Sequence, residues 1–78
     1  MKTKETTAWD FLLSTTCNRK VMKQFATGSM SASAVTHAFA HSDYAGEFRK
    51  LLRVNGTLYA RRLARKALRY RGIMKPTN

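Results

Sequence analysis

The chain has 78 residues, of which 44% are hydrophobic and 24% are charged. A chain of this size forms one small domain, and its share of apolar and aromatic residues excludes an intrinsically disordered protein. Fifteen Lys and Arg residues stand against four Asp and Glu residues, which gives a net charge of +11 at pH 7. Because such an excess repels itself, it indicates a polyanionic partner, although a solvated basic face without a specific ligand is the simpler alternative.

Cysteine content and apolar runs indicate where the protein resides. Cys17 is the single cysteine, so no disulfide forms within the chain, which agrees with a reducing compartment. The apolar run at residues 11–13 is far too short for a signal sequence or a membrane span. We therefore expect a cytoplasmic protein that does not enter a membrane.

The domain limits follow from where apolar periodicity begins and ends. Residues 1–6 show none, so they are expected to form a flexible arm. A single helical domain then occupies residues 7–73, and residues 74–78 form a tail.

Two helices are expected at the start of the domain. The first spans residues 7–15, with Thr6 or Thr7 as N-cap and Asp10 in its first turns, where the helix dipole favours a carboxylate. Further on, the apolar side chains change face and the intervening residues are poor helix formers. The chain should therefore break near residues 16–18, before a second helix at 18–27.

Two more helices are expected in the middle of the chain. Gly28 ends the second helix, and Ser31 caps a third at residues 31–40. Ser42 and Asp43 begin a fourth at residues 43–54. The expected buried residues are Ala34, Val35, Ala38 and Phe39 in the third helix, and Tyr44, Phe48, Leu51 and Leu52 in the fourth.

The last helix runs from Thr57, its expected N-cap, to Gly72, the residue expected to end it. Its apolar residues recur at the spacing of one buried stripe and are Ala60, Leu63, Ala64, Ala67 and Leu68. The opposite face carries five cations with no carboxylate after Glu47 to neutralise them, and these are Arg61, Arg62, Arg65, Lys66 and Arg69. The sequence thus predicts an all-α, small single domain of four to five short helices with a basic C-terminal helix.

Side chains suited to catalysis or metal binding are few. The four carboxylates lie near predicted helix starts, where the dipole gives them a structural role. They are Glu5, Asp10, Asp43 and Glu47. His37 and His41 have the i, i+4 spacing of a two-histidine metal site, but no further ligands lie at a recognisable spacing. We expect no enzymatic activity, no metal and no cofactor.

Residues 28–39, with the sequence GSMSASAVTHAF, contain a turn followed by a capped helix. A small residue marks the turn, a hydrophobic residue seats it, a hydroxyl caps the helix, and a branched aliphatic side chain locks it onto the preceding helix. These residues are Gly28, Met30, Ser31 and Val35. Over residues 20–40 the segment resembles the turn and second helix of helix-turn-helix DNA-binding proteins.

The resemblance implies that the third helix enters the major groove of DNA with its first residues. The base-reading candidates are then Ala32, Ser33, Thr36 and His37. None of them is Arg, Lys, Asn or Gln, so any preference among sequences is expected to be weak or based on DNA shape. An ordinary capped helix that packs through small residues is the alternative interpretation.

The sequence predicts a small basic nucleic-acid-binding protein, similar in size and charge to accessory DNA-binding regulators of phages and plasmids, with duplex DNA as the first candidate partner. The phosphate-contacting candidates are Arg61, Arg62, Arg65, Lys66, Arg69, Arg49, Lys50, Arg53, Arg19, Lys20 and Lys23. The alternative is an inhibitor or adaptor whose basic face binds an acidic protein or a nucleic-acid-processing enzyme. No long apolar stripe remains once the core is assigned, so we expect a monomer in isolation.

Two further expectations concern the last helix. Tyr59 and Tyr70 are expected in the core, although their position among arginines also suits stacking on bases. Replacing Arg61, Arg65 and Arg69 with Gln is expected to preserve folding, because Gln retains helix propensity.

Overall fold

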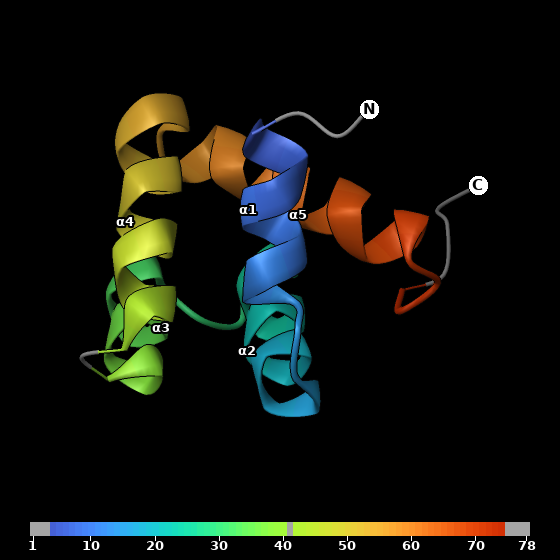
Figure 1. The fold of residues 1–78 in the computed structure, drawn as a ribbon, viewed down its shortest axis with the longest axis horizontal. Coiled ribbons are helices and arrows are strands. Elements are labelled where there is room, and N and C mark those ends of the chain that lie inside the picture. The colour runs from blue at the N-terminus through green and yellow to red at the C-terminus, as the bar shows by residue number, and fades with distance from the viewer. Residues whose placement is uncertain (1–3, 41, 75–78) are drawn as a thin grey trace.

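A computed structural model describes residues 4–40 and 42–74, which fold into helices joined by short turns, with no strand among them (Figure 1). The five helices are α1 (Lys4–Leu12), α2 (Thr16–Ala26), α3 (Ala32–Phe39), α4 (Asp43–Asn55) and α5 (Thr57–Tyr70). The predicted all-α fold is confirmed. None of these helices is both long and apolar enough to cross a membrane.

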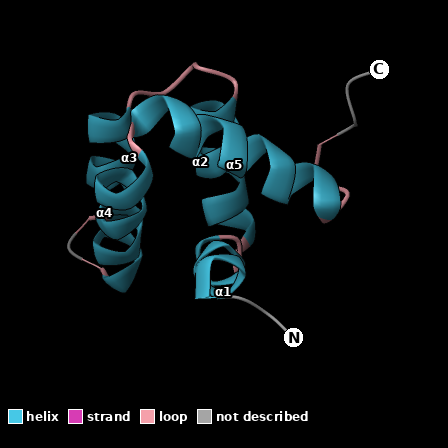
Figure 2. Cartoon of the chain, turned by 90° about the horizontal axis from the view of Figure 1, so that it is seen from above, coloured by secondary structure: helices cyan, strands magenta, loops and turns pink. Residues whose placement is uncertain are grey.

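All five helices contribute to one hydrophobic core. Phe48 of α4 lies at its centre, with edge-on ring contacts to Phe25 of α2 at 5.0 Å and to Phe39 of α3 at 6.1 Å between ring centres. The buried apolar residues are Trp9, Leu12, Leu13, Met22, Phe25, Ala26, Val35, Phe39, Ala45, Phe48, Leu51, Ala60, Ala64 and Leu68. Helix α5 runs across the others, and its C-terminal half extends beyond them in both views (Figures 1 and 2).

The N-terminal helices differ from the predicted boundaries at two points. Helix α1 begins at Lys4, three residues before the predicted start, because apolar periodicity detects a helix only where one face is buried. The predicted break between two helices is confirmed, but it lies at residues 13–15 and not near 16–18, since α1 ends at Leu12 and α2 begins at Thr16. Thr15 caps it by accepting a 3.0 Å hydrogen bond from the backbone N–H of Asn18. The rest of the predicted arm, residues 1–3, lies outside the described residues.

The turn between α2 and α3 is formed by the residues predicted to form it. Gly28 has φ +87°, and the backbone N–H groups of Gly28 and Ser29 donate to the carbonyls of Phe25 and Gln24 at 3.1 and 2.9 Å. This pair of hydrogen bonds is the Schellman motif that ends a helix. Ser31 then caps α3 by accepting from the N–H of Ala34 at 3.1 Å, as predicted.

Burial in the third helix corrects part of the prediction. Val35 and Phe39 are buried, but Ala34 and Ala38 are exposed. A helix of eight residues has room for a narrow buried stripe, and the two larger side chains occupy it.

The caps of the last helix are corrected at one end and confirmed at the other. Thr57 is the first helical residue and not the N-cap, because Gly56 with φ +80° takes that position. Gly72 ends α5 as predicted, with φ +73° and its N–H bonded to the carbonyl of Arg69 at 3.0 Å.

Two glycine substitutions should change stability in opposite directions. Gly28→Ala is expected to lower the free energy of unfolding by about 1 kcal/mol, because an L side chain is strained at positive φ. Gly46→Ala, inside α4 where an added Cβ meets nothing within 4 Å, is expected to raise it by about 0.5–1 kcal/mol. Urea denaturation followed by circular dichroism measures both. A loss of stability in both variants would contradict the backbone geometry described for α4.

Candidate nucleic-acid interface

Charge is divided unevenly among the helices. The four carboxylates belong to α1 and α4, and no Asp or Glu occurs between Asp10 and Asp43 or after Glu47. Helices α2, α3 and α5 therefore carry no negative side chain. Since α2 and α5 pack directly against each other, they form a part of the molecule whose formal charges are all positive.

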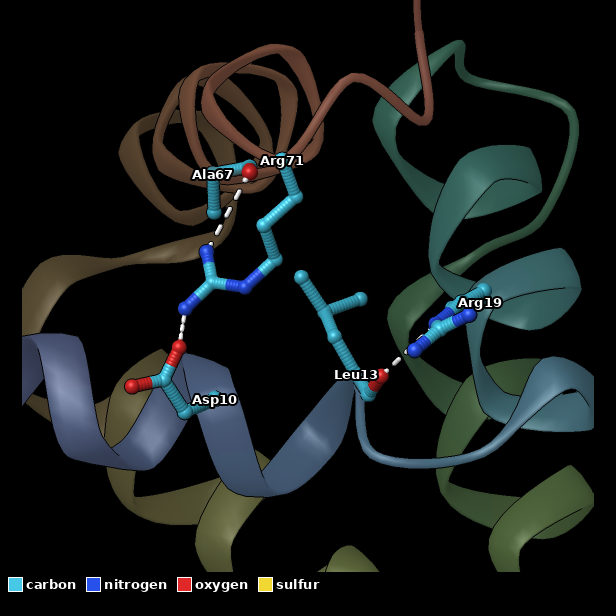
Figure 3. Close-up of polar contacts among 5 residues, drawn as sticks. All are labelled: Asp10, Leu13, Arg19, Ala67 and Arg71. Atoms are coloured by element: carbon cyan, nitrogen blue, oxygen red, sulfur yellow. Dashed lines mark hydrogen bonds and ion pairs between the residues drawn. The ribbon is translucent and has the colours of Figure 1, made fainter.

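Two of the carboxylates neutralise nearby cations. Asp10 forms an ion pair with Arg71, which follows α5, and Arg71 also donates to the carbonyl of Ala67 at 3.3 Å (Figure 3). Glu47 pairs with Lys50 within α4 at 3.5 Å. The prediction for Asp10 is corrected here, because it lies in the last turn of α1, where its partner is an arginine and not the positive end of the helix dipole.

Arg61 and Arg65 were predicted to face solvent, but the structure directs both side chains toward the end of α2. Nη1 of Arg61 donates to the carbonyl oxygens of Phe25 at 2.6 Å and Met30 at 3.1 Å, and its guanidinium lies 4.5 Å from the centre of the Phe25 ring. Nη1 of Arg65 donates to the carbonyl of Ala26 at 2.9 Å. Both side chains thus bind the C-terminal end of α2, where unpaired carbonyls and the helix dipole attract a cation.

Arg19 has a similar structural contact. Its Nε donates to the carbonyl of Leu13 at 2.9 Å, just beyond the end of α1 (Figure 3). Three of the predicted phosphate-binding arginines therefore hold helix ends together. Part of their hydrogen-bonding capacity is already used within the fold.

The side of α5 that faces away from the core combines cations with large apolar residues. We define the outer face of α5 as five exposed side chains that follow its first residue, Leu58, Tyr59, Arg62, Lys66 and Tyr70. Tyr59 is 51% exposed, Tyr70 is 86% exposed and Leu58 is 80% exposed. The expected core position of both tyrosines is therefore wrong. Arg69, at the edge of this face, is half-buried, and its Nε is buried without a hydrogen-bond partner.

The other predicted phosphate-binding cations form two groups. Lys20 and Lys23 are exposed on α2, where no carboxylate is near in sequence. Arg49, Lys50 and Arg53 are exposed on α4, which also bears Asp43 and Glu47. The two groups differ in local charge balance, so the α2 lysines add to the all-positive part of the molecule and the α4 cations do not.

The base-reading candidates on α3 are only partly available. Ser33 and His37 are exposed. Ala32 is half-buried against the core, and the hydroxyl of half-buried Thr36 donates to the carbonyl of Ala32 at 3.0 Å. Two of the four predicted side chains therefore face solvent freely, and they are one turn apart on the same helix.

A pocket lies between α1 and α4. Its lining includes Thr7, Phe11, Asp43, Glu47 and Lys50, with Phe11 stacked on Tyr44 at 4.7 Å between ring centres. Charges of both signs meet there. Within residues 4–40 and 42–74, no three His, Cys, Asp or Glu side chains gather as metal ligands would, and His41 lies outside that range.

The exposed tyrosines were the main residues that sequence reasoning misplaced. A signal for them existed, because at 100° per residue Tyr59 and Tyr70 lie within about 40° of Lys66 and on the side opposite Ala60 and Ala64.

Comparisons with known protein families, with curated proteins and with solved structures find no match to this chain.

Proposed function

We propose that this protein binds nucleic acid through the all-positive part formed by α2 and α5. The phosphate contacts come from Arg62 and Lys66 on the outer face of α5 and from Lys20 and Lys23 on α2. Ser33 and His37 on α3 are the remaining side chains available for contacts with bases.

The separation of charge between helices is the observation that supports this proposal. A net charge of +11 is unfavourable for a compact chain of 78 residues, and its four carboxylates all belong to α1 and α4. The side chains of Arg62 and Lys66 make no ion pair within the described part of the chain. A row of unpaired cations on a helix attracts a polyanion, and release of the polyanion's counterions supplies the binding free energy.

A second candidate function is a protein-binding module, the inhibitor or adaptor alternative. The observation that favours it is the corner between α4 and α5, where Val54 is 81% exposed and Leu58 is 80% exposed. Aliphatic side chains at that exposure contribute to protein interfaces and add little to phosphate binding. Under this alternative the cations would steer an acidic partner onto the corner.

Binding to duplex DNA tests the proposal directly. With about four phosphates contacted, the slope of log K against log salt should be about −3.6, from ~0.9 per phosphate. Fluorescence anisotropy of a labelled random duplex, measured over a series of salt concentrations, gives this slope. Failure to bind either duplex or single-stranded DNA at ~50 mM salt, where counterion release strongly favours binding, would reject the nucleic-acid function and leave the protein-binding module.

A further inference from the structure

We propose that the outer face of α5 binds single-stranded nucleic acid, with Tyr59 and Tyr70 stacking on unpaired bases while Arg62 and Lys66 contact the phosphates between them. This inference rests on the proposed function, and it specifies the form of nucleic acid that the face prefers.

The arrangement of side chains along α5 carries the inference. At 100° per residue, Tyr59, Arg62, Lys66 and Tyr70 lie within an arc of about 80° of the helix surface, so they form one row. In this row the two cations lie between the two aromatic rings. Tyr59 and Tyr70 are separated by about 16 Å along the axis, from ~1.5 Å per residue.

The exposure of the two rings is the second observation. Aromatic side chains normally contribute to a core or an interface because each buries a large apolar area. Tyr70 is 86% exposed and Tyr59 is 51% exposed. Among the described residues, neither ring takes part in a contact between aromatic rings. Tyr70 is the last residue of α5, whose C-terminal half projects beyond the other helices (Figures 1 and 2). Both rings are therefore free to stack on a ligand.

A single strand fits this row better than a duplex does. In a duplex the faces of the bases are stacked on one another, so an exposed ring on a helix surface reaches only the phosphates and groove edges. In a single strand the faces are available, and aromatic side chains interleaved with cations are the usual way in which proteins hold them. A second copy of this chain is disfavoured as the occupant, because the two cations would face their own copies across a symmetric interface.

The experiment compares two ligands and three forms of the protein. The probe is a labelled oligothymidylate of about 12 nucleotides, longer than the ~5 nucleotides that ~16 Å would span at duplex spacing. A random duplex of the same length is the second ligand. The parent protein is compared with Tyr59→Leu/Tyr70→Leu, which removes both rings, and with Tyr59→Phe/Tyr70→Phe, which keeps the rings and removes only the hydroxyls.

The expected result is a parent that binds the oligothymidylate more tightly than the duplex at equal salt. The Leu double variant should bind the oligothymidylate about 5-fold to 150-fold more weakly for each stacked base lost, with duplex affinity unchanged. The Phe double variant should match the parent. Circular dichroism of each variant checks that α5 remains folded.

Other outcomes separate the two proposals. Equal affinity of all three proteins for both ligands would overturn the single-strand inference and leave nucleic-acid binding by charge intact. Loss of affinity in the Phe variant as large as in the Leu variant would overturn stacking, since the hydroxyls would then be responsible. Failure of the parent to bind either ligand at ~50 mM salt would overturn both and favour a protein partner.

Discussion

Arg61→Met is expected to lower the free energy of unfolding by about 2–4 kcal/mol. The substitution removes charged hydrogen bonds to the carbonyls of Phe25 and Met30 and the contact with the Phe25 ring. Hydrogen bonds to charged groups contribute ~1.5–3 kcal/mol each, and a cation over an aromatic ring adds ~0.5–1 kcal/mol. The carbonyl of Phe25 retains a second donor, the N–H of Gly28, which places the expected loss below the full sum.

The effect is large for a domain of this size. At about 0.05–0.15 kcal/mol per residue, the whole domain is stabilised by roughly 4–12 kcal/mol. Arg62→Met is the matched control, because it removes the same charge from the neighbouring position of the same helix, where the side chain is exposed. It should change stability by about 0.5 kcal/mol or less. Urea denaturation measures the free energy of unfolding of both variants. Equal losses of stability in the two variants would show that Arg61 does not hold the end of α2.

This role of Arg61 also corrects the expectation that Gln at positions 61, 65 and 69 would leave folding unchanged. Arg61 and Arg65 together bind three carbonyls at the end of α2 and at the turn to α3. Replacing them would confound any loss of nucleic-acid binding with partial unfolding. A test of the charge on α5 must therefore use the exposed cations.

Arg62→Gln/Lys66→Gln is expected to weaken binding to duplex DNA by roughly 60-fold at ~0.1 M salt, from the loss of two phosphate contacts at ~0.9 each in the salt exponent. The slope of log K against log salt should become less negative by about 1.8 for the same reason. Gln retains helix propensity, so α5 should remain folded. Anisotropy titrations across the salt series measure both quantities.

Arg49→Gln/Arg53→Gln is the matched control for this second prediction. It removes the same two charges from the net +11, but from exposed positions on α4, the helix that also carries Asp43 and Glu47. Its affinity should fall much less than that of the α5 variant. If the two double variants lose affinity equally, then binding depends on net charge alone, and α5 is not the site.

The local features of this protein could be predicted from the order of its residues. Gly28, Ser31 and Gly72 were placed correctly because a helix end is set by the conformations and hydrogen bonds of a few adjacent residues. The buried stripe through Ala60, Ala64 and Leu68 was predictable for a similar reason, since periodicity is a property of one helix. The restriction of carboxylates to two helices was also predictable from the order of residues along the chain.

Which cations and aromatic rings remain free depends on how the helices pack together. A helical wheel gives the direction of Arg61 and Arg65 but not the neighbour in that direction, and here it is the carbonyl end of α2, more than thirty residues away in sequence. In the same way, the packing of the ends of α1 and α5 gives Asp10 its partner Arg71. Tyr59 and Tyr70 are exposed because none of the helices in the described part of the chain covers that arc of α5. Contacts between distant helices depend on how the whole core packs, and periodicity within one helix carries no information about that packing.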